Sequence, residues 1–344
     1  MTFGIIARCD NTGLGNQTRD LVKMLNPDRI LLINSAKFNN NKQYPEWYQG
    51  YNVTMTNGFP TKQEVAIFMD GLNSVLTCET FYHPHFINLA QRRKVKTLMQ
   101  YNYEFLDHLN KPDMPLPTYM ISPSYWKIDE VISKFSNDTT VVHIPPPIDS
   151  EEFATVRNNN LAKDHKRILH IGGKVASKDR NGTQTVIDML RHSKADYELV
   201  IRSQSELDIN CQDSRLTVEI GNVDSRSSMY DGFDAMVLPR RYAGLCLPMN
   251  EALMSGLPVF MTDISPNNRV LPQEWLVKSD KISKLRTRTT LDVYAADAEN
   301  LAQIVDNYMK EKNTNIEKQK AFDIATTNFS AKNLKQKYLD ILEK

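Results

Sequence analysis

Two successive series of short apolar segments, alternating with stretches of helical periodicity, constrain this chain more than any other feature. The first series comprises apolar segments at 3–7, 29–34, 65–70, 74–78, 97–101, 118–122 and 140–144. Strands that are apolar throughout and alternate with helices form parallel sheets with both faces covered. The sequence therefore predicts a doubly wound α/β architecture, in which ligands bind at the carboxyl ends of the strands.

The segment 143–149 interrupts this alternation. Its three consecutive prolines, Pro145 to Pro147, hold an extended backbone that cannot sit inside a sheet, so we interpret it as a linker. A second series follows, with apolar segments at 167–172, 197–202, 216–220, 235–239 and 259–262 and helices near 298–311 and 331–343. We expect two Rossmann-like domains, over 1–150 and 151–328, with a cleft between them and a final helix over 329–344.

Length and composition agree with two soluble domains. The 344 residues exceed the size at which a single core usually stops growing. The hydrophobic fraction of 41% and the charged fraction of 24% exclude a disordered chain, a collagen and a disulfide-rich miniprotein. The 42 Lys and Arg against 41 Asp and Glu exclude a uniformly basic surface for nucleic acid, but not local basic patches.

The lack of a recognisable targeting signal and the spacing of the cysteines predict a cytoplasmic protein. No segment approaches the roughly 18–20 apolar residues that span a bilayer, and the N-terminus lacks the features of a secretory signal. The four cysteines, at 9, 78, 211 and 246, are far apart and form no CxxC pair, which argues against a zinc site or a disulfide framework. Free thiols in a reducing compartment are the simplest interpretation.

The first candidate site is the turn 10–16, between the first apolar segment and the first helix. Gly13 and Gly15 let backbone amides approach an anion at a helix N-terminus, with Asn16 beside them. Thr18 stands where a dinucleotide-binding fingerprint has its third glycine, so that fingerprint is incomplete. The alternative interpretation is a tight strand-to-helix turn without a ligand.

The second candidate site, 170–182, occupies the matching place in the second series. Lys174, Lys178 and Arg180 surround its glycines, a composition suited to a diphosphate. Arg180 offers a planar fork to phosphate, whereas the lysines are point charges. A solvated loop is the alternative.

The third candidate site, 239–258, contains a glycine loop and a helix that we expect to open near Pro248. A nucleotide fits here, with its ribose hydroxyls on Glu251 in the first helical turn and Arg241 supporting its phosphates. Its phosphates would lie on the backbone amides of Gly244, Leu245, Cys246 and Leu247. The alternative makes Glu251 a capping residue only.

The stretch 241–259, RYAGLCLPMNEALMSGLPV, resembles the signature of family-4 glycosyltransferases of the GT-B fold. The segments 143–149, 170–182 and 328–338 are similar to the linker, the phosphate loop and the terminal helix of that family. The resemblance implies a final helix that crosses back onto the first domain. It also implies a retaining glycosyltransferase that uses a nucleotide diphosphate sugar, most simply a UDP-sugar, without a metal or a prosthetic group.

The sequence departs from the family pattern in the donor site. Ala243 stands where the family has a glutamate that touches the donor sugar, so an unusual donor such as a pentose fits. The family's phosphate-binding Arg and Lys are spaced differently from Lys174, Lys178 and Arg180, which leaves open the pair that holds the diphosphate. By the resemblance, Arg180 would also stabilise the departing diphosphate.

A second departure concerns the acceptor side. The family often places a histidine near the reacting sugar, and the stretch 101–104 has none. Asn102, Tyr103 and Glu104 are the candidates to face the acceptor there, and His83 is another.

The sequence also looks similar to glycosyltransferases of tailed bacteriophages, which decorate hydroxymethylated pyrimidines such as hydroxymethylcytosine. Two basic clusters could neutralise phosphates of double-stranded DNA. They comprise Arg92, Arg93, Lys94 and Lys96, and Lys281, Lys284, Arg286 and Arg288. The interpretation that follows is a DNA-modifying enzyme of the host cytoplasm.

Three alternatives remain open. A glycosyltransferase acting on protein or polysaccharide would differ only in its acceptor. A GT-B nucleotide-sugar epimerase would share the nucleotide site and add acid and base residues. A nucleotide-sugar sensor would bind the donor without turnover.

Overall fold

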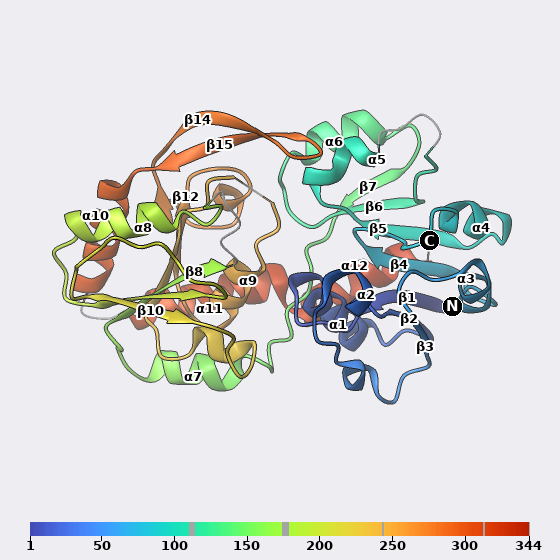
Figure 1. The fold of residues 1–344 in the computed structure, drawn as a ribbon, viewed down its shortest axis with the longest axis horizontal. Helices are drawn as coiled ribbons and strands as arrows, with labels where there is room; N and C mark the ends of the chain where they lie inside the picture. Colours follow the sequence, from blue (N-terminus) through green and yellow to red (C-terminus); the bar gives the residue numbers. More distant parts are fainter. Residues whose placement is uncertain (110–113, 174–178, 243, 312–313, 344) are drawn as a thin grey trace. The chain divides into compact units, whose positions relative to one another are not determined.

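The chain forms two compact units in the computed structural model, which describes residues 1–109, 114–173, 179–242, 244–311 and 314–343 (Figure 1). Unit 1 comprises Met1–Asp149 together with Phe329–Lys344, and unit 2 comprises Ser150–Asn328. The end of the chain therefore belongs to the first unit.

Unit 1 is built on a seven-stranded parallel sheet in the order β3-β2-β1-β4-β5-β6-β7. Its strands are β1 (Phe3–Arg8), β2 (Arg29–Ile33), β3 (Val53–Thr56), β4 (Ser74–Cys78), β5 (Lys96–Gln100), β6 (Tyr119–Ser122) and β7 (Thr140–His143). Its helices are α1 (Gly13–Leu25), α2 (Ala36–Asn39), α3 (Lys62–Phe68), α4 (Phe86–Arg92), α5 (Leu106–Leu109), α6 (Ile128–Phe135) and α12 (Ala331–Glu343), with short 3₁₀ turns at Pro45–Tyr48 and Tyr103–Phe105.

The prediction of a strand at 65–70 is wrong, because most of this segment belongs to helix α3. Thr61 and Glu64 form a reciprocal capping box, in which each side chain binds the other residue's backbone N–H. Val65 and Phe68, three residues apart, then bury one face of the helix. The third strand of the chain is instead β3, whose residues are mostly half-buried or exposed.

Unit 2 is built on a six-stranded parallel sheet in the order β10-β9-β8-β11-β12-β13, plus a separate antiparallel hairpin. The sheet contains β8 (Arg167–Gly173), β9 (Glu198–Ser203), β10 (Leu216–Ile220), β11 (Ala235–Leu238), β12 (Val259–Thr262) and β13 (Leu276–Val277), and the hairpin contains β14 (Ser279–Arg286) and β15 (Thr290–Ala296). The helices are α7 (Ala154–Ala162), α8 (Thr183–His192), α9 (Leu247–Met254), α10 (Ala298–Lys310) and α11 (Asn315–Phe329), with 3₁₀ turns at Ser227–Tyr230, Asn267–Arg269 and Gln273–Trp275.

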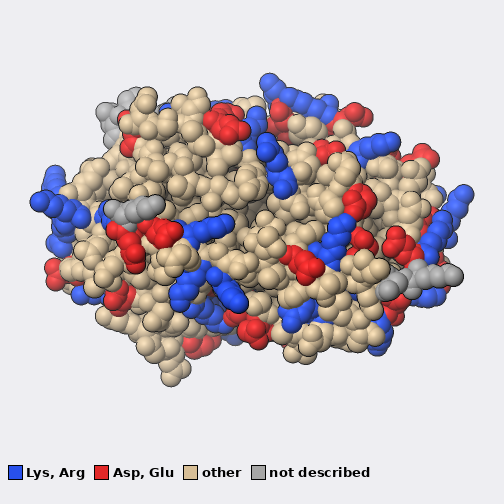
Figure 2. Space-filling view, turned by 180° about the vertical axis from the view of Figure 1, so that it is seen from behind, with Lys and Arg blue, Asp and Glu red and all other residues tan. Residues whose placement is uncertain are grey.

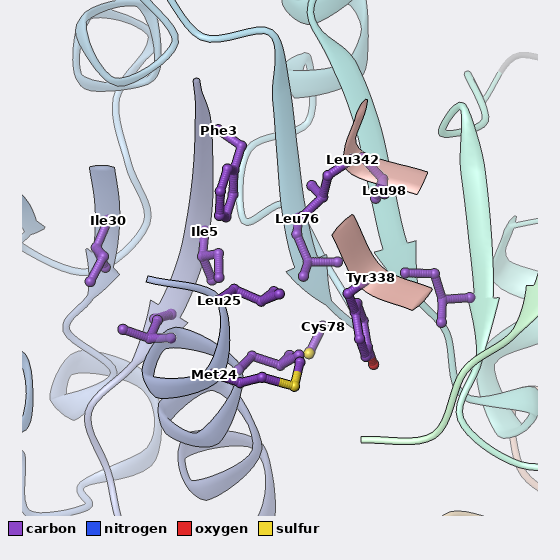
Figure 3. Close-up of a cluster of buried hydrophobic side chains, with 14 of the residues drawn as sticks. Phe3, Ile5, Met24, Leu25, Ile30, Leu76, Cys78, Leu98, Tyr338 and Leu342 are labelled. Carbon is purple, nitrogen blue, oxygen red and sulfur yellow. The ribbon is translucent and has the colours of Figure 1, made fainter. Parts of the chain in front are cut away.

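Helix α12 completes the core of unit 1. Its buried residues, Leu334, Tyr338, Ile341 and Leu342, belong to the same hydrophobic cluster as Leu76 of β4. Figure 3 shows Tyr338 and Leu342 beside Leu76. The Tyr338 hydroxyl also donates a 3.2 Å hydrogen bond to the carbonyl of Pro145, which ties the helix to the proline segment.

Asp10 organises the loops that follow β1 and β2. It is fully buried, and five side chains donate hydrogen bonds to its carboxylate. The donors are Arg8, Thr12, Ser35, Asn39 and Asn41. Burial alone would raise the pKa of Asp10, but the bonds from Arg8, Ser35 and Thr12 outweigh it and lower the pKa to about 2.

Truncation of a core residue in α12 tests the packing of this helix on unit 1. Leu334→Ala removes a fully buried side chain and should lower the free energy of unfolding by about 2–4 kcal/mol, measured by urea denaturation. Lys335→Ala, at an exposed position of the same helix, is the matched control and should have little effect. Equal effects of the two substitutions would contradict this packing.

Substitution of Asp10 gives a pH-dependent prediction. Because folding lowers the pKa of this carboxyl from 3.8 to about 2, the stabilisation is complete above pH 4 and is lost as the pH falls through 2. Asp10→Asn should therefore cost about 2 kcal/mol of unfolding free energy at pH 7. Urea titrations between pH 4 and 2 should show that the difference in unfolding free energy between the variant and the wild type becomes smaller. A difference that does not depend on pH would refute the role of the charge.

Candidate functional site

The strand order of unit 2 reverses between β8 and β11, because β9 and β10 lie on one side of this pair and β12 and β13 on the other. Sheets of this kind bind ligands at the carboxyl ends of the strands beside such a switch point. The predicted diphosphate-binding residues lie in the loops after β8 and β11. The two loops touch, since the backbone N–H of Arg241 donates a 2.9 Å hydrogen bond to the carbonyl of Arg180.

Gly182 lets the two loops approach each other. A Cβ atom at this position would lie 2.2 Å from the carbonyl oxygen of Pro239, and its φ of +75° is in the left-handed region. Asp179 then accepts hydrogen bonds from the backbone N–H groups of Thr183 at 2.7 Å and Gln184 at 3.0 Å. The first amides of α8 are therefore satisfied by this side chain and not left for a ligand.

His170 has a structural role. Its ring is fully buried, with Nδ1 2.9 Å from the carbonyl of Val237 and Nε2 2.9 Å from the hydroxyl of Thr183. Burial lowers its pKa to about 4, so the ring is neutral at physiological pH. The histidine thus links β8 to β11 and to α8.

Two of the predicted phosphate-binding cations lie on these adjoining loops. The Arg180 guanidinium lies 4.7 Å from the ring centroid of Tyr242, a cation–π distance, and Arg241 precedes that tyrosine. Guanidinium groups at this edge of the sheet suit the charge and the geometry of a diphosphate. Three predicted residues of the site, Lys174, Lys178 and Ala243, lie outside the described residues.

The loop before α9 presents unsatisfied amides. Within the described part of the chain, no backbone N–H from Gly244 to Leu247 donates a hydrogen bond. The carbonyl of Leu245 accepts a 3.3 Å hydrogen bond from the side chain of Arg240. Cys246 is the N-cap residue of α9. Amides of this kind at a helix N-terminus form a favourable environment for an anion.

Glu251 lies just beyond the first turn of α9, and not within that turn as expected. The helix begins at Leu247, so Glu251 is its fifth residue, and the first turn contains no acidic residue. This placement corrects the expected position and excludes simple capping. The reason is local: the helix opens before Pro248, which tolerates the first turn because it needs no backbone donor there.

Two donors from a neighbouring segment hold the Glu251 carboxylate. Arg226 Nε donates to Oε1 at 2.8 Å, and the buried Tyr230 hydroxyl donates to Oε2 at 2.6 Å. A second carboxylate, Glu152, lies 3.4 Å from Nη1 of Arg226. A carboxylate has about four acceptor positions, so each Glu251 oxygen can still accept a hydrogen bond from a ligand.

The first predicted turn in unit 1 is tightly packed. A Cβ atom on Gly15 would lie 1.8 Å from the carbonyl oxygen of Asp10, so only glycine fits this close approach. Gly13 is the first residue of α1, and Thr12 caps the helix by accepting from the Gly15 N–H. The Asn16 side-chain oxygen is buried and accepts no hydrogen bond from any residue that the structure describes.

The candidates after β5 divide into two groups. Asn102 donates a hydrogen bond to Glu79, which follows β4. Desolvation is the largest effect on the pKa of Glu79 and raises it, the charge of Arg8 lowers it, and the charge of Glu104 raises it further. The net result is a raised pKa. The Tyr103 side chain is instead buried within unit 1. Its ring lies 4.9 Å from that of Trp126, and its hydroxyl donates to Glu130.

Glu79 was not anticipated, although a polar residue directly after a buried strand is a detectable signal. His83, the other acceptor-side candidate, is half-exposed, and its ring centroid lies 5.9 Å from that of His85. Burial, His85 and Lys62 together lower the pKa of His83.

Several residues of the two basic clusters are engaged within the fold. Arg93 donates to the carbonyl of Ala66 at the end of α3, and Lys96 donates to the carbonyl of Leu342 at the end of α12. Arg92 and Lys94 remain exposed.

In the hairpin cluster, Lys281 pairs with Asp292 at 2.6 Å and Lys284 lies opposite the same aspartate. Arg286 donates to the Thr290 hydroxyl, and Arg288 lies in the hairpin turn. Figure 2 shows Lys and Arg side chains interspersed with Asp and Glu on the face that it presents.

A hollow of about 550 Å³ in unit 1 lies at the start of β2 and the end of α3. Arg29 and Arg93 line it, and both already donate to carbonyls of α3. Within the described ranges, no three His, Cys, Asp or Glu side chains converge as a metal site. None of the helices described is long and apolar enough to cross a membrane.

Comparison with known proteins relates the chain to others by structure only. No protein-family profile and no curated protein matches it. Anabaena HepE in complex with UDP and glucose has a TM-score of 0.67 at 11% identity over 99% of both chains. A glycosyltransferase from Rickettsia africae has a TM-score of 0.69 at 12% identity, over 99% of this chain and 97% of that one.

Sucrose-phosphate synthase from Thermosynechococcus elongatus gives a TM-score of 0.65 at 11% identity, over 99% of this chain and 98% of that one. At such identities the likeness establishes the fold. Together with the two parallel Rossmann-like sheets and the C-terminal helices, it confirms the predicted GT-B fold.

Proposed function

We propose that this protein is a glycosyltransferase that moves a sugar from a UDP-sugar to an acceptor hydroxyl with retention of configuration. The observation that carries the proposal is the pairing of an oriented carboxylate with backbone amides that donate to no described residue, at one strand edge of unit 2. Glu251 is held by two donors, and the amides of 244–247 precede it in the same helix–loop segment. A nucleoside diphosphate needs both groups, one for the ribose diol and one for the phosphates.

Glu251 is proposed to bind the ribose. Its two oxygens each keep an acceptor position after the bonds from Arg226 and Tyr230, which matches two adjacent hydroxyls. Because the protein donors fix the side chain before the ligand arrives, little rotamer entropy is lost on binding.

The backbone amides of 244–247 and the side chains of Arg180 and Arg241 are proposed to bind the diphosphate, together with Lys178. In the reaction, the bond between the anomeric carbon and the phosphate oxygen breaks, and its electron pair leaves with UDP. The acceptor oxygen attacks from the same face, and its proton passes to the departing phosphate oxygen. Preorganised N–H donors and guanidinium groups stabilise the charge that develops there.

In unit 1, Asn102 and Glu104 are proposed to face the acceptor with Glu79, while Gly13, Gly15 and Asn16 provide the turn beside the donor sugar. Tyr103 is left out, because its hydroxyl binds Glu130. The solved structures of HepE with UDP and with UDP-glucose support a UDP-sugar as donor. UDP-glucose is the first donor to test, with a UDP-pentose as the comparison that the Ala243 substitution suggests.

Protein or polysaccharide is favoured over DNA as the acceptor. Arg93 and Lys96 each use an N–H donor on a helix carbonyl, and Lys281 is neutralised by Asp292, so the two clusters have fewer groups available for phosphate than the sequence alone indicates. A DNA acceptor would still be recognised by transfer of label from a UDP-sugar to hydroxymethylated DNA.

The ribose assignment is tested with a charge-removing substitution of the same shape. Glu251→Gln should weaken UDP binding about 10- to 100-fold, measured by calorimetry, because hydrogen bonds to a charged group contribute about 1.5–3 kcal/mol. Glu152→Gln is the matched control, since this carboxylate also contacts Arg226 but is not assigned to the ribose. Unchanged UDP affinity in Glu251→Gln, or equal losses in both variants, would reject the assignment.

A further inference from the structure

An exposed pair of stacked aromatic rings lies at the carboxyl edge of the sheet in unit 1. Phe38, in the helix after β2, and Phe59, in the loop after β3, have ring centroids 4.9 Å apart and nearly parallel planes. Their side chains remain 40% and 64% exposed. Exposed aromatic surface of this kind marks a binding surface more often than an isolated exposed residue does.

A third ring connects this pair to polar groups. The ring of Tyr82, in the loop after β4, lies 6.3 Å from that of Phe59. The positive charge of Arg8 acts on the hydroxyl of Tyr82, and the Arg8 guanidinium also pairs with Asp10. We call Phe38, Phe59 and Tyr82 the aromatic platform, in which Phe38 and Phe59 supply the accessible surface and Tyr82 is buried behind them at 8% exposure.

Glu79 and Asn102 supply hydrogen-bonding groups at the same strand edge. Glu79 precedes Tyr82 by three residues, and Asn102 donates to its carboxylate. Glu79 keeps solvent-accessible surface although its carboxyl is desolvated enough to raise its pKa, and among the described residues Asn102 makes the single side-chain hydrogen bond to it. Carboxylate and amide oxygens at an exposed edge accept bonds from hydroxyl groups.

We propose that the aromatic platform, with Glu79 and Asn102, binds the acceptor and that the acceptor presents an uncharged sugar ring. The proposal rests on the glycosyltransferase function proposed above and names its acceptor class. A pyranose has a face of polarised C–H bonds, which fits the negative face of an aromatic ring, and a rim of hydroxyls, which fits a carboxylate and an amide.

The charges at this edge distinguish a sugar from a nucleic acid. A base could also stack on Phe59, but a nucleic acid additionally needs cations along its backbone. Lys37, whose side chain packs against Gly58, brings one cation to the aromatic pair, but Arg8 is already paired with Asp10, and Glu79 and Glu104 would repel a phosphate. An uncharged glycan meets no such penalty.

Saturation-transfer NMR on the full chain tests the platform directly, with methyl α-D-glucopyranoside and methyl β-D-galactopyranoside as probes. The wild type should transfer saturation to ring C–H protons of at least one glycoside. Phe59→Ala should weaken that binding about 3- to 10-fold, the range expected for loss of one aromatic contact. Glu79→Gln should weaken it as well, because the amide replaces one acceptor oxygen by a donor.

Ile67→Ala is the matched control, since Ile67 is 57% exposed in unit 1 but lies at the end of α3 beside the hollow. The proposal fails if neither glycoside receives saturation, if the Phe59 and Ile67 variants lose it equally, or if decathymidylate binds instead in a manner that Phe59→Ala abolishes. Calorimetry with UDP on the same samples separates the two proposals. Absence of UDP binding would reject the donor site, whereas a wild type that binds UDP but neither glycoside would reject the platform alone.

Discussion

Close approach of backbone to backbone at two glycines sets the geometry on which both units depend. At Gly15 the carbonyl of Asp10 occupies the space of a side chain, and at Gly182 the carbonyl of Pro239 does so. The first contact closes the turn between β1 and α1, and the second joins the turn before α8 to the residue after β11, each beside the switch point of its sheet. These two turns place the helices so that polar residues of separate loops meet at the carboxyl edge.

Buried polar networks then fix the side chains at these edges. Asp10 gathers the loops after β1 and β2, while Arg226 and Tyr230 hold Glu251 in unit 2. In both cases the carboxylate is oriented by protein donors before any ligand arrives. A hydrogen-bonding group held in this way loses less entropy on binding than a free surface side chain.

The sequence predicts those parts of the fold whose signals are local. Continuous apolar runs identify strands such as β1 and β8, and the glycine turns identify the loops that carry Arg180 and Gly244. The segment 65–70 misleads because its apolar run outweighs the capping box formed by Thr61 and Glu64. The strands β3 and β14 are missed because most of their residues are exposed or half-buried and form no apolar run.

The residues that hold Glu251 cannot be predicted from local sequence patterns. Arg226 and Tyr230 meet Glu251 from 25 and 21 residues away, a contact that depends on how α9 packs against the 3₁₀ turn before β11. The aromatic pair likewise joins Phe38 to Phe59 across two strand ends. Spacing along the chain carries no information about such pairs, because strand order decides which loops become neighbours.

Hydrogen–deuterium exchange with and without saturating UDP tests the central claim most directly, because it reports where the nucleotide binds without presuming an acceptor. Slower exchange is expected in peptides that cover 179–183 and 244–250, where the backbone amides of 244–247 gain a partner. Unchanged exchange in these peptides, with protection confined to unit 1 or absent altogether, would contradict a nucleotide site at the switch point of unit 2.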